Sequence, residues 1–356
     1  MNAKIDNIHS VTVLMLDRHL GNLVVSLSSI VALAKHFRGR NFCLAIDGAY
    51  REVVESITEL DRIIYYPRTE LHQSHLLREA VLFLRFIHQI RTTHSDGLID
   101  LQGGNASSLV TLLSGASYRI SNSAARRPYL YNEKIDLPAG KHKVRSYSEI
   151  AAALSVPTDD SYFPLRASEF RRSSLQRSLK VHGITLEKPI VSIHAGAGNI
   201  HKQWTTDGFA EVADWLSARA FQVIFVGAGR DLDKIHAVMS ALNLKAYNFG
   251  GSISLGELMA LFEMSSLFLG NDSGPMHLAA AVGTPVVALF GPVDENRWRP
   301  LSPNATVLRG QEPCEDCRAR RQHCQDAPCI TQLSPDKVKQ AIEQLLQKEE
   351  TDRAQH

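Results

Sequence analysis

The sequence predicts an α/β protein with two doubly wound parallel sheets in tandem. At 356 residues the chain exceeds what one hydrophobic core usually organises, so two domains of ordinary size are expected. Short apolar segments alternate with segments of helical periodicity along both halves. The apolar segments lack the polar alternation of half-exposed strands, which indicates parallel sheets covered on both faces.

The expected elements follow from the period of the apolar residues. In the first half, strands are expected at 11–16, 42–46, 62–66 and 97–101, and helices at 23–37, 74–91 and 105–115. In the second half, strands are expected at 190–194, 222–227, 266–270 and 286–290, and helices at 207–218, 232–242, 276–282 and 335–348. Ser254 and Glu257 form a capping-box pattern that opens one more helix.

A change of composition marks the expected division between the domains. Between about 155 and 188 the pattern becomes that of a polar, basic helix that ends in a glycine. We therefore expect domains of residues 1–172 and 173–356, which face a cleft. Ligands of such sheets bind beyond the carboxyl ends of the strands, so the chemistry is expected in strand-to-helix loops.

The composition excludes several classes of protein. The net charge is only +2, which argues against a general nucleic-acid binder. The apolar run near the N-terminus is too short for a signal-peptide core or a membrane span. Five cysteines in a chain of this length do not form a disulfide scaffold. We therefore expect a cytoplasmic protein that does not bind nucleic acid.

The most informative segment is LFLGNDSGPMHLAAAVGTPVVALFGP at 267–292. A buried strand runs into Asp272, Ser273 and Gly274, and a helix follows at once. Exposed N–H groups at a helix start, with a glycine that permits close approach, suit a diphosphate, and Asp272 is placed to hold sugar hydroxyls beside it. The alternative is that Asp272 and Ser273 are ordinary N-caps and that His277 is a core histidine.

Two further loops of the second half carry glycines after a strand. In HAGAGNIHKQW at 194–204, Lys202 can neutralise a phosphate and Trp204 can form a wall of the site, although a surface lysine is the default interpretation. The loop GAGRD at 227–231 is a weaker candidate, because it does not complete the dinucleotide-binding pattern GxGxxG.

These segments resemble a known family. The order HAGAGNIHKQW, VIFVGAGRD and NDSGPMHLAAAVGTPVVALFGPVD is similar to that in the ADP-heptose:lipopolysaccharide heptosyltransferases, glycosyltransferase family 9. LGNLVVSLSSIVALAKHF and IDLQGGNASSLVTLLSGASYRI in the first half are similar too, so the resemblance covers about residues 11–345. It implies the GT-B fold, with two Rossmann-like domains around a central cleft, the first for the acceptor and the second for the nucleotide sugar.

The resemblance implies an inverting glycosyltransferase that moves heptose from ADP-heptose to the inner core of lipopolysaccharide. No cofactor is required for this chemistry, and peripheral contact with the inner membrane is expected. Lys202 would contact the donor phosphates, Asp272 the heptose hydroxyls, and the Ser273–Gly274 backbone the diphosphate. His277 would support that loop, and the loop that starts at Gly227 would lie near the adenosine.

The chain departs from the family at the proposed catalytic base. Where the family has Gly-Asp, this sequence has Gly21 and Asn22. An amide does not accept a proton at neutral pH, so another group serves as base or the chain is a catalytically silent relative that binds a sugar nucleotide. Asp17 and His19 lie in the same loop and are the candidates; the alternative for Asp17 is a turn carboxylate at the end of a strand.

Four cysteines lie close together, at Cys314, Cys317, Cys324 and Cys329. A CxxC pair with two more thiolates predicts a structural metal site, with zinc as the default metal and iron as the second choice. The alternative is reduced cysteines or a redox-labile pair. Because some autotransporter heptosyltransferases are thought to bind iron in a comparable segment, transfer to a protein acceptor is a second functional hypothesis. A sugar-nucleotide epimerase of the same fold is another.

Basic residues surround the cysteines, and together they predict a surface for an anionic glycolipid or a membrane face. Surface arginines without function are the alternative. The residues are Arg297, Arg299, Arg318, Arg320, Arg321 and His323.

Overall fold

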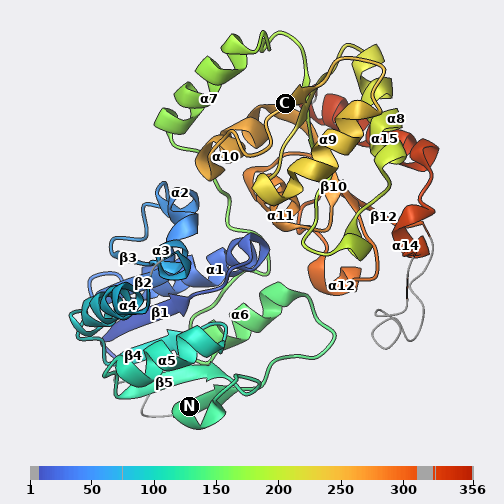
Figure 1. Ribbon diagram of the computed structural model, residues 1–356. Helices are drawn as coiled ribbons and strands as arrows, with labels where there is room; N and C mark the ends of the chain where they lie inside the picture. The colour runs from blue at the N-terminus through green and yellow to red at the C-terminus, as the bar shows by residue number, and fades with distance from the viewer. Residues whose placement is uncertain (1–7, 74, 311–323, 325, 355–356) are drawn as a thin grey trace. The chain divides into compact units, whose positions relative to one another are not determined.

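The computed structural model describes residues 8–73, 75–310, 324 and 326–354. The chain divides into two compact units, Met1–Phe163 and Pro164–His356 (Figure 1). Each unit holds one six-stranded sheet in which every pair of neighbouring strands is parallel. The prediction of two doubly wound parallel sheets is confirmed.

The sheet of the first unit has the order β3-β2-β1-β4-β5-β6. Its strands are β1 (Ser10–Met15), β2 (Asn41–Asp47), β3 (Ile63–Tyr66), β4 (Gly97–Asp100), β5 (Tyr118–Asn122) and β6 (Glu133–Ile135). Its α-helices are α1 (Leu20–His36), α2 (Arg51–Val54), α3 (Arg68–His72), α4 (Leu76–Arg91), α5 (Asn105–Leu113) and α6 (Lys143–Ala152). Helices α3, α4 and α5 enclose a hydrophobic cluster on one face, while α1 and α6 pack against each other and against other parts of the sheet.

The sheet of the second unit has the order β12-β11-β10-β7-β8-β9. Its strands are β7 (Ile190–His194), β8 (Gln222–Phe225), β9 (Tyr247–Asn248), β10 (Ser265–Asn271), β11 (Val286–Leu289) and β12 (Ala305–Leu308). Its α-helices are α7 (Glu169–Val181), α8 (Thr206–Ala218), α9 (Leu232–Ser240), α10 (Leu255–Met264), α11 (Gly274–Val282), α12 (Glu295–Trp298), α14 (Pro328–Thr331) and α15 (Pro335–Ala354).

Both sheets have the same topology. Counted from the first strand of its own unit, each sheet has the order 3-2-1-4-5-6 of Rossmann-like domains. In that order, successive strands are added on one side of the first strand up to the third, and on its other side from the fourth onward. Ligands of such sheets bind beyond the carboxyl ends of the first and fourth strands, where the order switches. The topology therefore directs attention to the loops after β1 and β4 in the first unit, and after β7 and β10 in the second.

The division between the units precedes the expected boundary at 172/173, because α7 belongs to the second unit. Arg172 of α7 forms an ion pair with Glu263 of α10 at 2.8 Å, and Ser174 donates a hydrogen bond to Glu257 at 2.7 Å. Arg172 and Ser174 of this polar, basic helix thus bind acidic residues of α10.

Two local details refine the expectations at helix starts. The capping box is confirmed, since Ser254 and Glu257 exchange hydrogen bonds of 3.3 and 2.8 Å. The sequence-based expectation placed Gly21 and Asn22 in a loop. The first helix begins at Leu20, so both residues lie in its first turn.

Gly103 holds the loop between β4 and α5 in a conformation that a larger residue would disturb. Its φ is +69°, and an added Cβ would lie 2.5 Å from the Cβ of Ala125. We expect Gly103→Ala to lower the free energy of unfolding by roughly 2–5 kcal/mol, from left-handed strain plus overpacking. Gly140 is the matched control, because its φ is +67° but nothing lies within 4 Å of an added Cβ.

For Gly140→Ala we expect only the backbone strain, which should lower the free energy of unfolding by about 1–2 kcal/mol. Urea unfolding of both variants measures the difference. Equal losses would show that the contact with Ala125 does not constrain the loop.

Candidate active site

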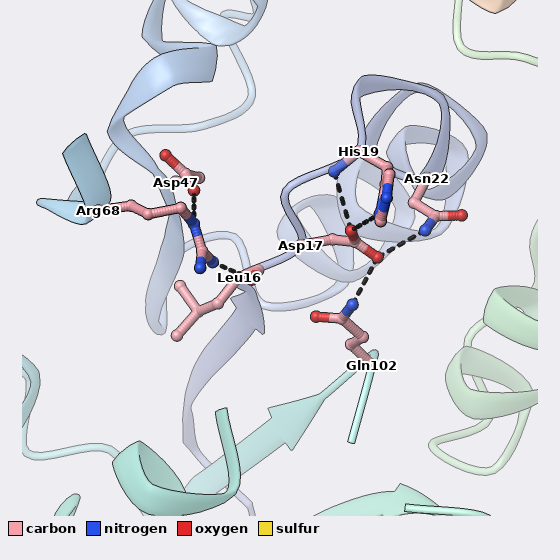
Figure 2. A network of polar contacts seen from close by, with 7 residues as sticks. All are labelled: Leu16, Asp17, His19, Asn22, Asp47, Arg68 and Gln102. Carbon is pink, nitrogen blue, oxygen red and sulfur yellow. Dashed lines mark hydrogen bonds and ion pairs between the residues drawn. The ribbon is translucent and has the colours of Figure 1, made fainter. Parts of the chain in front are cut away.

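The loop after β1 places a buried carboxylate at the centre of a polar network (Figure 2). The side chain of Asp17 is only 2% exposed. Its Oδ1 accepts hydrogen bonds from the backbone N–H of His19 at 2.9 Å and from His19 Nδ1 at 2.8 Å. Its Oδ2 accepts from the side-chain amides of Asn22 and Gln102, each at 2.5 Å. The three predicted catalytic residues therefore contact one another.

The hydrogen bonds determine the charge of Asp17. Burial by itself raises the pKa of this carboxyl, but the hydrogen bonds from His19, the positive charge of a protonated His19 and the amide of Asn22 together lower the pKa below its ordinary value. Asp17 is therefore ionised at neutral pH, and a carboxylate only accepts hydrogen bonds. The 2.8 Å contact thus requires the proton of a neutral His19 to sit on Nδ1.

His19 presents the other side of its ring to solvent. Its side chain is 62% exposed, and within the described residues no hydrogen-bond partner is found for Nε2. With Nδ1 protonated, Nε2 of the neutral ring carries a free lone pair. An imidazole oriented by a carboxylate through one nitrogen and open at the other is the arrangement of a general base.

Gln102 was not predicted from the sequence, and a second buried carboxylate holds it in place. Asp100, the last residue of β4, accepts hydrogen bonds from the backbone N–H groups of Gln102 at 3.0 Å and Gly103 at 2.9 Å, and from the hydroxyl of Tyr131 at 2.6 Å. Burial nevertheless raises the pKa of Asp100, since it outweighs these bonds. Asp100 orders the loop that brings Gln102 to Asp17.

A third buried carboxylate is that of Asp47, the last residue of β2. Arg68 donates to the carboxylate of Asp47 and, at 2.7 Å, to the backbone carbonyl of Leu16 (Figure 2). The guanidinium therefore ties the end of β2 to the end of β1, directly before Asp17. The ends of β1, β2 and β4 carry one buried carboxylate each, and side-chain or backbone donors satisfy all three.

In the second unit, the loops after β7 and β10 bring Lys202 and Asp272 together. Lys202 Nζ lies 2.6 Å from Asp272 Oδ2, and the side chains are 28% and 5% exposed. Two predicted donor-binding residues from separate loops are thus direct partners. The backbone N–H of Asp272 donates to the carbonyl of Leu289 at 3.0 Å, which ties this loop to β11.

Ser273 is the N-cap residue of α11, but its hydroxyl does not cap the helix. It lies 3.1 Å from His194 Nδ1, and His194 Nε2 lies 3.5 Å from Asp231. Burial alone would raise the pKa of Asp231. The contacts with His194 and with the N–H of Ala228 have the larger combined effect, so the pKa lies below its ordinary value. The side chain of Ser273 is thus used within the fold, while the first N–H groups of α11 have no partner inside the helix.

Glycines make room for Asp231. A Cβ on Gly196 would lie 2.2 Å from Asp231 Oδ1, and one on Gly227 would lie 2.9 Å from Asp231 Cβ. Packing alone therefore requires small residues in both loops. The expected position of the Gly227 loop near an adenosine remains a prediction.

Asn271 and Trp204 are both used in the packing of the second unit. The amide of Asn271 is fully buried, donates to the carbonyls of Ala195 at 2.8 Å and Gly196 at 3.2 Å, and accepts from the N–H of Trp204 at 3.0 Å. Trp204 is fully buried and donates from Nε1 to the carbonyl of Leu333 at 2.9 Å. The expectation that Trp204 walls the site was wrong, because burial of its large ring stabilises the core.

The remaining predicted residues are placed only in part. His277 is buried on α11 with its ring 6.1 Å from that of Trp298, and its expected support of the loop remains a prediction. Cys324 and Cys329 pack in the second unit, whereas Cys314 and Cys317 lie outside the described residues. Among the residues that the structure describes, no group of three or more potential metal ligands is found.

The expected basic surface is also described only in part. Arg297 and Arg299 are exposed, and the other four members lie outside the described ranges, at Arg318, Arg320, Arg321 and His323. Within the described helices, none combines the length and the apolar composition needed to cross a membrane.

Comparisons with known proteins identify the family. The model of glycosyltransferase family 9 (heptosyltransferase) matches residues 83–327, which is more than half of the chain. The chain belongs to glycosyltransferase family 9. Lipopolysaccharide heptosyltransferase 2 of Escherichia coli (strain K12) is 28% identical over 233 residues, which cover 62% of this chain and 67% of the relative.

Solved structures of other proteins confirm the GT-B fold of this family 9 glycosyltransferase. The crystal structure of a family 9 glycosyltransferase from Veillonella parvula DSM 2008 superposes with a TM-score of 0.82 at 23% identity, covering 96% of this chain and 98% of the other. The ADP-heptose lipopolysaccharide heptosyltransferase II of E. coli superposes with a TM-score of 0.78 at 22% identity, covering 96% and 99%. The family model begins after Asp17, His19 and Asn22, so the match does not rest on them.

Proposed function

We propose that this heptosyltransferase transfers heptose from ADP-heptose to a lipopolysaccharide core acceptor with inversion at the anomeric carbon. The names of its relatives support the donor and the acceptor class. The observation that carries the proposal is the contact of 2.8 Å between Asp17 and the exposed ring of His19, because it supplies the base that Asn22 does not.

The donor half of the reaction is assigned to the second unit. The start of α11 offers backbone N–H groups and the positive end of a helix dipole to a diphosphate. Lys202 adds a positive charge beside it, and Asp272 adds an acceptor for sugar hydroxyls. Positive charge at the departing ADP lowers the barrier, because negative charge develops there as the bond to the anomeric carbon breaks.

The acceptor half is assigned to the first unit. His19 Nε2 removes the proton from an acceptor hydroxyl while that oxygen forms the new bond to the anomeric carbon. The bond between this carbon and the diphosphate breaks in the same displacement, and ADP leaves with the electron pair. The resulting imidazolium donates from Nδ1 to the ionised Asp17, which stabilises its charge.

Asn22 has a specific role in this arrangement. Its amide nitrogen donates to Asp17 Oδ2 at 2.5 Å, so it stabilises the negative charge of Asp17. An aspartate at position 22 would place a second carboxylate against the first, and two carboxylates at such a distance do not both ionise. The amide at position 22 and the carboxylate at position 17 therefore belong together.

The alternatives predict different products. A protein acceptor would yield heptosylated protein rather than glycolipid, and a catalytically silent relative would bind donor without transfer. The exposed Nε2 of His19 favours an active enzyme over the silent alternative, because a proton acceptor in the proposed position is intact.

Lys202 and Asp272 are expected to recognise different parts of the donor. We expect Lys202→Ala to weaken the binding of both ADP and ADP-heptose by about 10- to 100-fold, since hydrogen bonds to charged groups contribute about 1.5–3 kcal/mol. We expect Asp272→Ala to weaken ADP-heptose by a similar factor but not ADP, because ADP has no heptose and the change frees Lys202 from its partner. Isothermal titration calorimetry with both ligands measures the four constants.

Lys339→Ala is the control for loss of an ion pair, since Lys339 Nζ also lies 2.6 Å from a carboxylate, that of Glu211. It should alter neither affinity. Equal weakening of ADP and ADP-heptose by Asp272→Ala would assign Asp272 to the nucleotide, and unchanged affinities in both variants would remove the proposed donor site.

The proposed base can be tested by single-turnover kinetics. We expect His19→Ala and Asp17→Asn to lower the transfer rate by roughly 10²- to 10⁴-fold, since general-base catalysis contributes about that factor. Neither change should weaken donor binding. We expect Asn22→Asp to give no increase, because its carboxylate would repel Asp17. His36→Ala, which changes an exposed histidine at the other end of α1, should leave the rate unchanged.

An increase of 100-fold or more in Asn22→Asp would contradict this assignment and would restore position 22 as the site of the base. A native protein that binds donor but modifies neither glycolipid nor protein would instead establish the silent alternative.

We also propose a structural metal held by Cys314, Cys317, Cys324 and Cys329. The donor set is that of a tetrahedral zinc or iron site, and the buried Cys329 adjoins the core of the second unit. We expect about one equivalent of metal, and a lower melting temperature after chelation. Elemental analysis of reduced protein purified without added metal is the measurement; less than a tenth of an equivalent would refute the site.

A further inference from the structure

Helix α4 of the first unit has apolar side chains on two opposite sides. Its inner side contributes Phe86, Ile87 and Ile90, which are buried in the hydrophobic cluster beneath the helix. These residues account for the packing of α4 on the sheet, where it lies next to α3 (Figure 1).

The outer side of α4 exposes further large apolar side chains. Leu77 is 86% exposed, Leu84 is 62% exposed and Val81 is 47% exposed. Single exposed leucines are ordinary on protein surfaces, but several along one helix mark a surface that binds something. The fold of the first unit does not require them, because the inner side already closes the core.

The exposed residues form one stripe with arginines beside it. Leu77, Val81 and Leu84 are spaced at i, i+4 and i+7, so they lie above one another on the helix. Arg78 and Arg85 each follow a leucine of this stripe by one residue, at about 100° around the helix, and so they flank it along one side. Both arginines are exposed.

The charge of α4 is one-sided as well. From Leu76 to Arg91 the helix has three arginines and one glutamate, Glu79. Glu79 is two positions past Leu77 and two before Val81, so helical geometry places it on the side away from the stripe. No carboxylate of α4 therefore offsets the arginines where the leucines are exposed.

We propose that this outer face of α4 binds the surface of an anionic phospholipid bilayer. Leucine side chains would enter the boundary between headgroups and acyl chains, and Arg78 and Arg85 would contact lipid phosphates. The stripe from Leu77 to Leu84 spans about 10 Å along a helix roughly 10 Å wide, so it covers an area on the order of 100 Å². That area is far below the roughly 800 Å² per partner of a stable dimer, which favours a lipid surface over a second copy of the chain.

The proposed membrane face differs from the basic region expected around the cysteines, because it lies in the first unit. It does not depend on the proposed transfer reaction, although an enzyme that acts on a lipid-anchored glycan has to reach a membrane. Vesicles without any glycan acceptor therefore test it separately.

The test is sedimentation of the full-length protein with vesicles of phosphatidylcholine, with and without one quarter phosphatidylglycerol, at two salt concentrations. We expect binding to the anionic vesicles that weakens as salt increases. Leu77→Glu/Leu84→Glu should reduce the partition coefficient at least tenfold. Arg78→Gln/Arg85→Gln should reduce it about 25-fold on anionic vesicles, at about fivefold per arginine.

Leu186→Glu/Leu244→Glu is the matched control, since these leucines of the second unit are 58% and 45% exposed. It should bind vesicles as the native protein does. All variants should keep the native melting temperature and the native affinity for ADP, which excludes misfolding as the cause of lost binding.

Three results would overturn the proposal. The first is a native protein that does not sediment with anionic vesicles. The second is a leucine variant that sediments as well as the native protein. The third is a dimer, measured by light scattering, that the leucine changes dissociate while vesicle binding is absent. Failure of the transfer proposal looks different, because vesicle binding would persist although no acceptor is modified.

Discussion

The candidate site depends on one constraint, which is that a buried carboxylate at the end of a strand must find hydrogen-bond donors. In the first unit Asp17, Asp47 and Asp100 all meet this constraint at the same edge of the sheet. Asp17 alone takes its donors from three different side chains. Satisfying its charge therefore determines where His19, Asn22 and Gln102 lie, and the orientation of the histidine ring follows from the charge of its neighbour.

Under the proposed mechanism, this dependence lets the chain lack an aspartate at position 22 and still present a base. The amide at that position is a donor to Asp17, and a donor is what a carboxylate in this place requires. In the proposed mechanism the proton acceptor is the imidazole of His19 at the N-cap of α1, in place of the carboxylate that the family resemblance implied at position 22. The exchange involves two positions at once, since a carboxylate at 22 and one at 17 would disfavour each other.

The sequence predicted the architecture because the period of the apolar residues is a local property, and both sheets and most of their strands followed from it. It also named Asp17, His19, Lys202 and Asp272, because each lies at the end of a buried strand or in the loop behind one. It did not predict Gln102, which meets Asp17 from 85 positions away, or the contact of His194 with Asp231. Such partners are set by tertiary packing and leave no periodic pattern.

Long-range contacts also bear on two other sequence-based expectations. Trp204 follows a loop of small and polar residues, which suggested a ligand wall, but a large ring gains most by entering the core of its unit. The basic helix that contains the expected boundary at 172/173 packs on α10, where Arg172 pairs with Glu263, 91 positions further along the chain. In both cases the deciding interaction joins residues that are far apart along the chain.

The pairing of Lys202 with Asp272 has a consequence for how a donor is recognised. A lysine already neutralised by a carboxylate at 2.6 Å attracts a free phosphate less than an unpaired lysine would. A ligand that brings only a diphosphate must compete with Asp272 for the ammonium group. A ligand that also brings sugar hydroxyls gives the carboxylate new donors, so that neither partner is left buried and unsatisfied. If the pair binds the donor as proposed, it favours an intact nucleotide sugar over the nucleotide product, which is the preference that a transferase needs in order to release ADP and bind the next donor.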